Sequence, residues 1–176
     1  MKKINLFVSM LAVAGLGFTS CSDDDNNSTS ENVKIEGTYN LKEVNTAAET
    51  DFDQDNDSHI NQMEESDCYN NGRIVLNSDN TFEYKITGIL VSGGEAGCAE
   101  TKTVTGVYTS QPAADPNNAL ITLTYDDNGQ TATRQFTKIG TELSWSDNTI
   151  LSTYPDRNDE GAAVLVPGAT EYVYKK

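Results

Sequence analysis

The residues best placed to do chemistry are carboxylates that recur at every second position from Glu49 to Asp57. Side chains of one charge this close together repel one another unless a cation neutralises them. From Asp53 onward, the segment DQDNDSHINQME follows the ligand order of an EF-hand-like calcium loop, in which hard oxygens wrap around the ion. The predicted ligands are the side chains of Asp53, Asp55, Asp57, Asn61 and Glu64, together with the backbone carbonyl of His59.

Two features of this segment depart from an EF-hand. Ser58 stands where a glycine normally makes the sharp turn, which costs about 1–2 kcal/mol if the residue must be left-handed. Neither flank has a helical pattern, although Ile60 fits the position that usually anchors such a loop to a core. The alternative is a solvated acidic face in an acidic protein. Calcium is therefore a hypothesis of equal weight to an empty loop.

The sequence offers little to a catalytic mechanism. Its single histidine, His59, lies in the acidic segment and not beside a candidate serine or cysteine. Nucleophilic catalysis by Ser/His/Asp or Cys/His therefore lacks a base. No GxSxG, HExxH, Walker or dinucleotide motif occurs, and no pair among the 27 acidic residues is singled out for glycoside hydrolysis. We predict that the protein is not an enzyme.

Residues 1–20 have the pattern of a lipoprotein signal peptide. Two lysines precede an apolar stretch over residues 6–18, which is too short to span a membrane. The following GFTSC at 17–21 resembles a bacterial lipobox, so we expect Cys21 to be lipidated and to become the N-terminus. SDDD at 22–25 resembles the acidic export signal of Bacteroidetes surface lipoproteins. The alternatives are an ordinary secreted protein and a plain acidic linker.

The charge of the chain limits its partners. With 12 Lys and Arg against 27 Asp and Glu, the formal charge is -15, which repels nucleic acid.

Residues 21–32 are polar, and we expect a flexible tether that holds the folded part about 18 Å from the lipid. The predicted domain covers residues 33–176. We expect a monomer, anchored in the outer membrane and exposed on the cell surface.

Of the three cysteines, Cys21 lies in the lipobox, whereas Cys68 and Cys98 lie in the predicted domain. If Cys21 carries lipid, Cys68 and Cys98 are left as a pair in an oxidising compartment, where a disulfide is the default. In the chain-entropy model, a disulfide that closes the loop between Cys68 and Cys98 stabilises the folded state by roughly 3–4 kcal/mol. The alternative of two free thiols lacks a CxxC motif or a partner histidine.

The predicted domain consists of short segments with alternating hydrophobicity. No segment has a helical apolar stripe of three turns, and Asn128-Gly129 is a strong hairpin signal. Eight to ten strands with short connections predict an all-β fold, an antiparallel up-and-down β-barrel. The expected strands are 34–44, 73–76, 81–89, 103–109, 119–125, 130–139, a strand around Leu143 and Trp145, 148–154, 163–166 and 170–175.

Several short motifs, taken in order, resemble the lipocalin-like lipoproteins of Bacteroidetes. They are GTY at 37–39, CYNN at 68–71, IVL at 74–76, DNTF at 79–82, GVY at 106–108, ITL at 121–123 and LSW at 143–145. Tyr39 stands where that family commonly has tryptophan, and Asn80 where it commonly has glycine. The resemblance implies a lipocalin-like barrel, of the calycin type, that carries a small apolar or amphipathic ligand.

Two functions stay open at this point. The first is a ligand carrier, and the second is an interaction module whose loops bind a protein or glycan while its barrel is filled by its own side chains. Bulky aromatic residues at alternating positions favour filling if they point inward: Tyr39, Phe82, Tyr84, Phe136, Trp145, Tyr172 and Tyr174. The resemblance favours the carrier, which we take as the first hypothesis.

Overall fold

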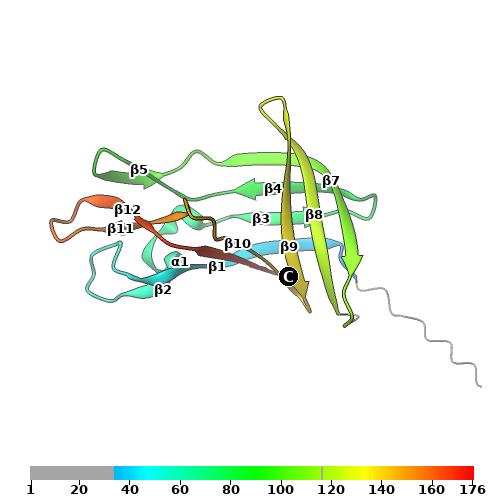
Figure 1. Cartoon of the computed structure of the whole chain (residues 1–176), viewed down its shortest axis with the longest axis horizontal. Coiled ribbons are helices and arrows are strands. Elements are labelled where there is room, and N and C mark those ends of the chain that lie inside the picture. Colours follow the sequence, from blue (N-terminus) through cyan, green and yellow to red (C-terminus); the bar gives the residue numbers. More distant parts are fainter. Residues whose placement is uncertain (1–33, 116) are drawn as a thin grey trace, which may run out of the picture.

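The computed structural model describes residues 34–115 and 117–176, and these form an eight-stranded antiparallel β-barrel (Figure 1). Pairing of the first barrel strand with the last closes the barrel. The predicted fold class is therefore confirmed. In chain order the barrel strands are β1 (Gly37–Thr50), β3 (Arg73–Leu76), β4 (Thr81–Ile86), β7 (Lys102–Pro112), β8 (Asn118–Asp127), β9 (Gln130–Ile139), β10 (Glu142–Asp147) and β13 (Thr170–Lys175).

Alternating hydrophobicity gives these strands one inner and one outer face. In β8, Ala119, Ile121, Leu123 and Tyr125 are buried, while the residues between them are partly exposed. Asn128 and Gly129 join β8 to β9 with φ angles of 55° and 82°. A two-residue hairpin of this kind needs positive φ at both positions, which Asn and Gly tolerate. The predicted hairpin is confirmed.

Three long connections lie together at one end of the barrel, which we call the capped end (Figure 1). The first, residues 51–72, contains β2 (His59–Asn61), the short helix α1 (Gln62–Glu65) and a 3-10 turn η1 (Asp67–Tyr69). The second contains the hairpin of β5 (Ile89–Ser92) and β6 (Glu95–Cys98), and the third contains the hairpin of β11 (Thr153–Arg157) and β12 (Ala163–Pro167).

Two predicted strands end or begin elsewhere in the structure. The segment expected at 81–89 ends at Ile86, and β5 begins at Ile89 as part of a separate hairpin. The segment expected at 148–154 turns instead, because the Ser152 N–H donates to the Thr149 carbonyl and the Ser152 hydroxyl bonds the Asp147 carboxylate. Such local hydrogen bonds compete with strand pairing.

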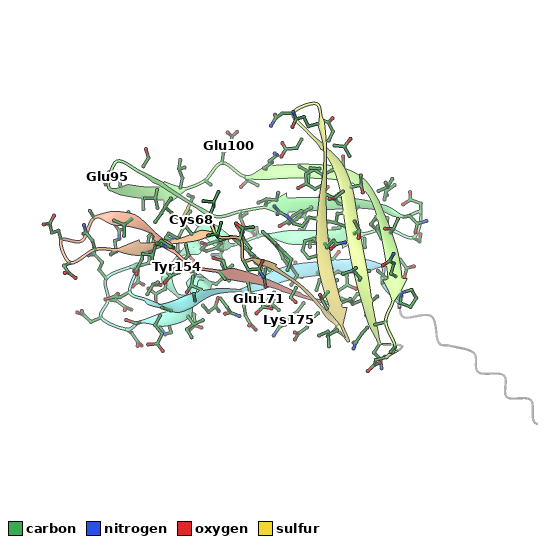
Figure 2. All side chains as sticks on the ribbon, in the orientation of Figure 1. Cys68, Glu95, Glu100, Tyr154, Glu171 and Lys175 are labelled. Atoms are coloured by element: carbon green, nitrogen blue, oxygen red, sulfur yellow. A yellow bond between two sulfur atoms is a disulfide. The ribbon has the colours of Figure 1, made fainter. Side chains whose placement is uncertain are left out.

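Bonds between the long connections make the capped end one unit. The Cys68–Cys98 disulfide, predicted from the cysteine count, joins η1 to β6 (Figure 2). The Ala163 N–H donates to the Gly94 carbonyl at 2.8 Å, which links β12 to the β5–β6 hairpin. Each long connection is thereby fixed to another that is distant in sequence.

The described chain begins and ends at the opposite end of the barrel. Lys176 Nζ lies 4.9 Å from the centroid of the Tyr39 ring and donates to the carbonyl of Lys34. The Tyr39 hydroxyl donates to the carbonyl of Ile35 at 2.6 Å. The signal peptide, Cys21 and the tether lie outside the described residues. Within the described part, no helix is long and apolar enough to cross a membrane.

Aromatic side chains fill the barrel. Tyr84 packs edge-to-face on Phe136 and Tyr174, with centroid distances of 5.9 and 6.0 Å. Of the seven bulky aromatic residues named from the sequence, five are at most 2% exposed, whereas Trp145 and Tyr172 are partly exposed. The centre of the barrel is therefore built from the protein's own side chains, and its aromatic core reaches solvent at Trp145 and Tyr172.

Candidate functional site

The acidic segment forms an irregular loop between β1 and β2 at the capped end. Its carboxylates accept hydrogen bonds from nearby backbone: the Asp55 N–H donates to Asp53 at 3.2 Å, and the Asp57 N–H donates to Asp55 at 2.8 Å. The tight turns fall at Gln54 and Asn56, with φ angles of 64° and 72°. The residue expected to turn, Ser58, is not among the residues with positive φ.

The structure does not gather the six predicted calcium ligands around one point. His59 and Asn61 belong to β2, which pairs with β1. The Asn61 side-chain oxygen accepts from the N–H groups of Val44 and Met63, so it holds β1 and caps α1. Glu64 lies in α1, with its carboxylate 3.4 Å from His59 Nε2. The second half of the segment therefore folds as a strand and a helix rather than as a wrapped loop.

A different set of carboxylates approaches closely enough to share a cation. Asp51, Asp53 and Glu65 each place one oxygen within 4.8 Å of the others, so Asp53 alone comes from the predicted set. Among the described residues, Asp51 Oδ1 is buried and has no hydrogen-bond partner. Glu65 is 3% exposed and accepts from the Phe52 N–H at 2.7 Å. Asp51 belongs to the alternating acidic run, but nothing in the sequence distinguishes Glu65 from its neighbour Glu64.

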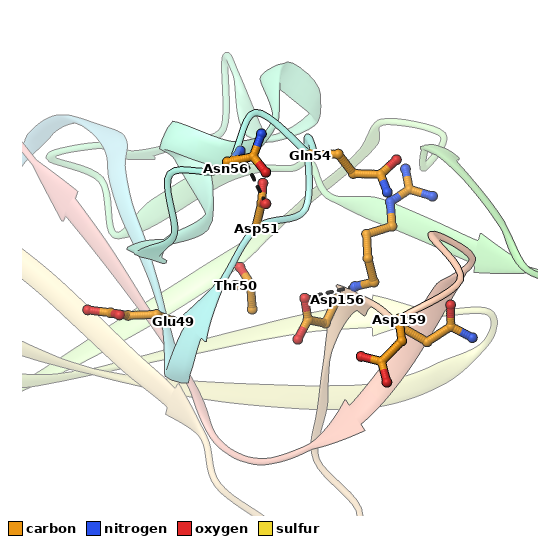
Figure 3. A pocket seen from close by; sticks show the side chains of 9 residues that line it. Glu49, Thr50, Asp51, Gln54, Asn56, Asp156 and Asp159 are labelled. Carbon is orange, nitrogen blue, oxygen red and sulfur yellow. Dashed lines mark hydrogen bonds between the residues drawn. The ribbon is translucent and has the colours of Figure 1, made fainter.

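A polar pocket of about 450 Å³ lies beside this group, between the acidic loop and the β11–β12 hairpin (Figure 3). Arg157 joins its two sides, because Nε donates to the Phe52 carbonyl and Nη1 to the Gly161 carbonyl. Acidic side chains outnumber this one cation, so the pocket suits a cation or a polar partner better than an apolar ligand. It is lined by Glu49, Thr50, Asp51, Gln54, Asn56, Asp156, Arg157, Asn158 and Asp159.

His59 contacts three carboxylates. Its Nδ1 lies 2.7 Å from Glu65 Oε1, and its Nε2 lies 3.4 Å from Glu64 and 3.8 Å from Asp57. The hydrogen bond to Glu65 raises the pKa of His59 above its usual value, against the effect of desolvation, and the charges of Glu64 and Asp57 act in the same direction as the bond. The imidazolium form therefore stabilises the base of the acidic loop.

We expect His59→Gln to destabilise the protein more at pH 6 than at pH 8.5. Because the pKa of His59 is raised by folding, its contribution is fully present below the unfolded pKa and is lost as pH rises through the folded pKa. Thermal melts of both proteins at the two pH values measure this difference. An equal change in melting temperature at both pH values would contradict the charged contact.

A second candidate site lies in the barrel wall between β9 and β10. These strands pair at three positions, from Glu142 opposite Ile139 to Ser144 opposite Thr137. Beyond Ser144, β10 stays with β13, while the remainder of β9 stays with β8 and diverges from β10 (Figure 1). We call this the β9–β10 break, and Arg134 and Trp145 stand on its two sides.

Side chains bridge the β9–β10 break by stacking. The Arg134 guanidinium carbon lies 4.0 Å from the centroid of Trp145, and Trp145 in turn stacks on Tyr172 with centroids 4.8 Å apart and planes 4° apart. Arg134 Nη1 donates to the Tyr84 hydroxyl at 3.2 Å. The sequence prediction missed Arg134, although alternation along β9 places it on the same face as Phe136, which is buried.

The two sites have opposite chemistry on one scaffold. The fold and sites define an antiparallel β-barrel protein with an acidic pocket at the capped end and a cationic, aromatic stack in the barrel wall. No family model matches the chain, and no match is found among the curated proteins or the solved structures. The function of the protein therefore has to be inferred from the geometry of these sites.

Proposed function

We propose that the protein is a lipid-anchored β-barrel of the cell surface that binds a small apolar or amphipathic ligand without catalysis. The observation that carries this proposal is the partly exposed aromatic layer at the β9–β10 break. Trp145 and Tyr172 offer a stacked apolar surface there, and aromatic surfaces bury much area at low entropic cost. The resemblance to lipocalin-like lipoproteins supports the same class of ligand.

The ligand binds at the break rather than in the centre of the barrel. Phe82, Phe136 and Leu143, which occupy the centre, are at most 2% exposed and leave no surface for a guest molecule. The pocket at the capped end is lined by polar and charged side chains and suits an apolar ligand poorly. Of the seven bulky aromatic residues named from the sequence, all within the described part of the chain, Trp145 and Tyr172 at the break are the ones that are partly exposed.

Mass spectrometry of the exported protein tests this proposal. The protein is purified from its host without detergent exchange, extracted with organic solvent, and its non-covalent small molecules are identified. We expect an apolar or amphipathic compound at close to one per chain. Absence of any such compound, together with unchanged Trp145 emission on addition of apolar compounds, would favour the interaction module.

Lipid attachment at Cys21 is the anchoring part of the proposal. Gly37 begins β1 at the barrel end opposite the cap, so a tether at the N-terminus would turn the capped end away from the membrane. We expect palmitate labelling of the wild type and none of Cys21→Ala, and we expect added protease to cleave the protein on intact cells. Labelling that survives in Cys21→Ala, or full resistance to protease, would contradict this orientation.

A second candidate function is an interaction module whose acidic loop is stabilised by calcium. The observation that favours it is the buried, unpartnered Asp51 Oδ1 beside Asp53 and Glu65. A buried carboxylate oxygen without a partner is costly, and a hard cation with oxygen ligands would satisfy it. The capped end, with its polar pocket, would then be the face that meets a protein or glycan.

Calcium at 2 mM is expected to raise the melting temperature by a few degrees relative to chelator. With an affinity of about 10⁻⁴–10⁻³ M, the gain is roughly 0.6–1.8 kcal/mol. Asp51→Asn should abolish the shift, whereas Asp55→Asn should leave it, because Asp55 is outside the group of three close carboxylates. A calcium shift that survives in Asp51→Asn and is lost in Asp55→Asn would support the EF-hand ligand order instead. Absence of a shift in the wild type would show that the acidic residues form only a solvated face.

A further inference from the structure

The Arg134 guanidinium has few acceptors for its five N–H donors. One donor is used by the Tyr84 hydroxyl, and the guanidinium carbon lies 4.0 Å from the centroid of Trp145 and 5.7 Å from that of Tyr84. No carboxylate of the described residues lies within 4.0 Å of Arg134, although the chain holds 27 acidic residues. Asp147, the inward-facing carboxylate that ends β10, is bonded to the Ser152 hydroxyl instead.

A second unused donor lies in the same stack. The indole Nε1 of Trp145 is buried and has no hydrogen-bond partner among the described residues. A buried N–H without an acceptor costs about 1–3 kcal/mol, and a desolvated cation without an anion costs more. The neighbouring hydroxyls of Tyr84 and Tyr174 bond each other at 3.1 Å, and burial keeps the pKa of Tyr174 well above its usual value. The Tyr174 hydroxyl is therefore protonated, and the stack carries the positive charge of Arg134.

Resting on the proposed function, we propose that the β9–β10 break binds the carboxylate of an amphipathic molecule, held by Arg134 and the indole N–H of Trp145. A guanidinium matches the two oxygens of a carboxylate. One guanidinium balances one negative charge, and the net charge of -15 opposes a more highly charged anion such as a phosphate dianion. The site therefore selects a monoanion.

The apolar part of the ligand has a place next to the carboxylate. Tyr172 and Trp145 supply stacked aromatic surface at the break. Ile150 and Leu151 follow β10 within four residues of its end and are 97% and 85% exposed. An adjacent pair of large aliphatic residues this exposed suits contact with an alkyl chain. An alkyl carboxylate would cover apolar surface and satisfy both donors at once.

The experiment uses Trp145 emission, because Trp145 is the single tryptophan of the chain. Decanoate, decan-1-ol and decyl phosphate are titrated into the folded wild-type protein below their micelle concentrations. We expect decanoate to bind at least tenfold more tightly than decan-1-ol, because the alcohol cannot neutralise Arg134. We also expect decanoate to bind more tightly than decyl phosphate. Tighter binding of the phosphate would overturn the assignment to a carboxylate.

Variants of Arg134 test whether this residue causes the preference for decanoate. Arg134→Gln should lower decanoate affinity at least tenfold and leave decan-1-ol affinity unchanged, and Arg134→Lys should fall between wild type and Arg134→Gln. Arg73→Gln is the matched control, because Arg73 pairs with Glu83 on the outside of the barrel and should leave both affinities unchanged. Circular dichroism checks that each variant folds. If Arg134→Gln does not fold, the affinities of decanoate and decan-1-ol for the wild type and for Arg134→Lys still show whether Arg134 holds the carboxylate.

The outcomes separate this inference from the proposed function. Equal binding of decanoate and decan-1-ol, unaffected by Arg134→Lys or Arg134→Gln, overturns the carboxylate site and leaves the apolar carrier intact. Absence of any change in emission with all three compounds overturns both. Tighter binding of decanoate that is lost in Arg134→Gln supports both.

Discussion

Replacing both Cys68 and Cys98 with serine is expected to lower the free energy of unfolding by roughly 3–4 kcal/mol. The disulfide closes a loop of 30 residues and joins η1 to β6, two segments that lie outside the barrel sheet. Without it, the unfolded chain gains conformational freedom that the folded state does not. For a domain of this size, the melting temperature should fall by about 10–15 °C. Thermal and denaturant melts of the double variant against the wild type measure the loss.

The reduced wild type is the matched control for this variant. With reductant present, the wild type and the double variant should melt together, because neither then has the cross-link. Limited proteolysis should cut the reduced protein first within residues 51–72 or 87–101, where only the short strand β2 pairs with a barrel strand. Quantitative alkylation of both cysteines without reductant, or a loss below about 1 kcal/mol, would show that the bond is absent or contributes little.

The barrel could be predicted from the sequence because its strands are locally encoded. β8 and β9 alternate over ten residues each and meet at Asn128-Gly129, whose conformational preference specifies a two-residue hairpin. Tyr39, Phe82 and Phe136 lie in such alternating strands and are buried. Period-two alternation and turn chemistry act over a few residues, which is the range at which a sequence can be interpreted without a structure.

The long connections could not be predicted in the same way. β5 and β6 pair with each other rather than with the barrel, and β2 adds to β1 through only two register positions. What fixes them is non-local: a disulfide, the Ala163–Gly94 hydrogen bond, and contacts of Arg157 with Phe52, which is 105 positions away. Strand length and hydrophobicity carry no information about such partners, so the segment at 148–154 was expected to be a strand and is a turn followed by β11.

The candidate sites show the same division. The alternating acids predict a calcium site from Asp53 onward, whereas the carboxylates that approach one another are those of Asp51, Asp53 and Glu65. Asn61 lies in β2, where it bonds the Val44 N–H, and Glu64 lies in α1. Arg134 was missed because its significance depends on strands β4 and β10, which supply Tyr84 and Trp145. An arginine in an alternating strand is ordinary in sequence. It becomes informative only when the structure places it on the inner face without a carboxylate.

Phe136→Ala is expected to lower the free energy of unfolding by about 3–5 kcal/mol. Phe136 is 1% exposed and packs edge-to-face against Tyr84, Tyr174 and Trp145, so its removal leaves a cavity bounded by rings that cannot collapse easily. Ile139→Thr on the same strand is the control, because Ile139 is 58% exposed and threonine keeps the β-branch. The control should change stability by no more than about 0.5 kcal/mol. Denaturant melts of both variants measure the difference.

The size of the Phe136 effect bears directly on where a ligand can bind. If the barrel centre is packed as tightly as the burial indicates, the full loss appears and the ligand is confined to the β9–β10 break. A loss below about 1 kcal/mol would mean that Phe136 lines an internal cavity instead of packing against other side chains. The proposed ligand would then bind inside the barrel and not at the β9–β10 break. In the first case, the cavity left by Phe136→Ala borders Trp145, whose ring centroid lies 6.5 Å from that of Phe136. That variant should therefore admit the alkyl end of decanoate more deeply and bind it at least as tightly as the wild type.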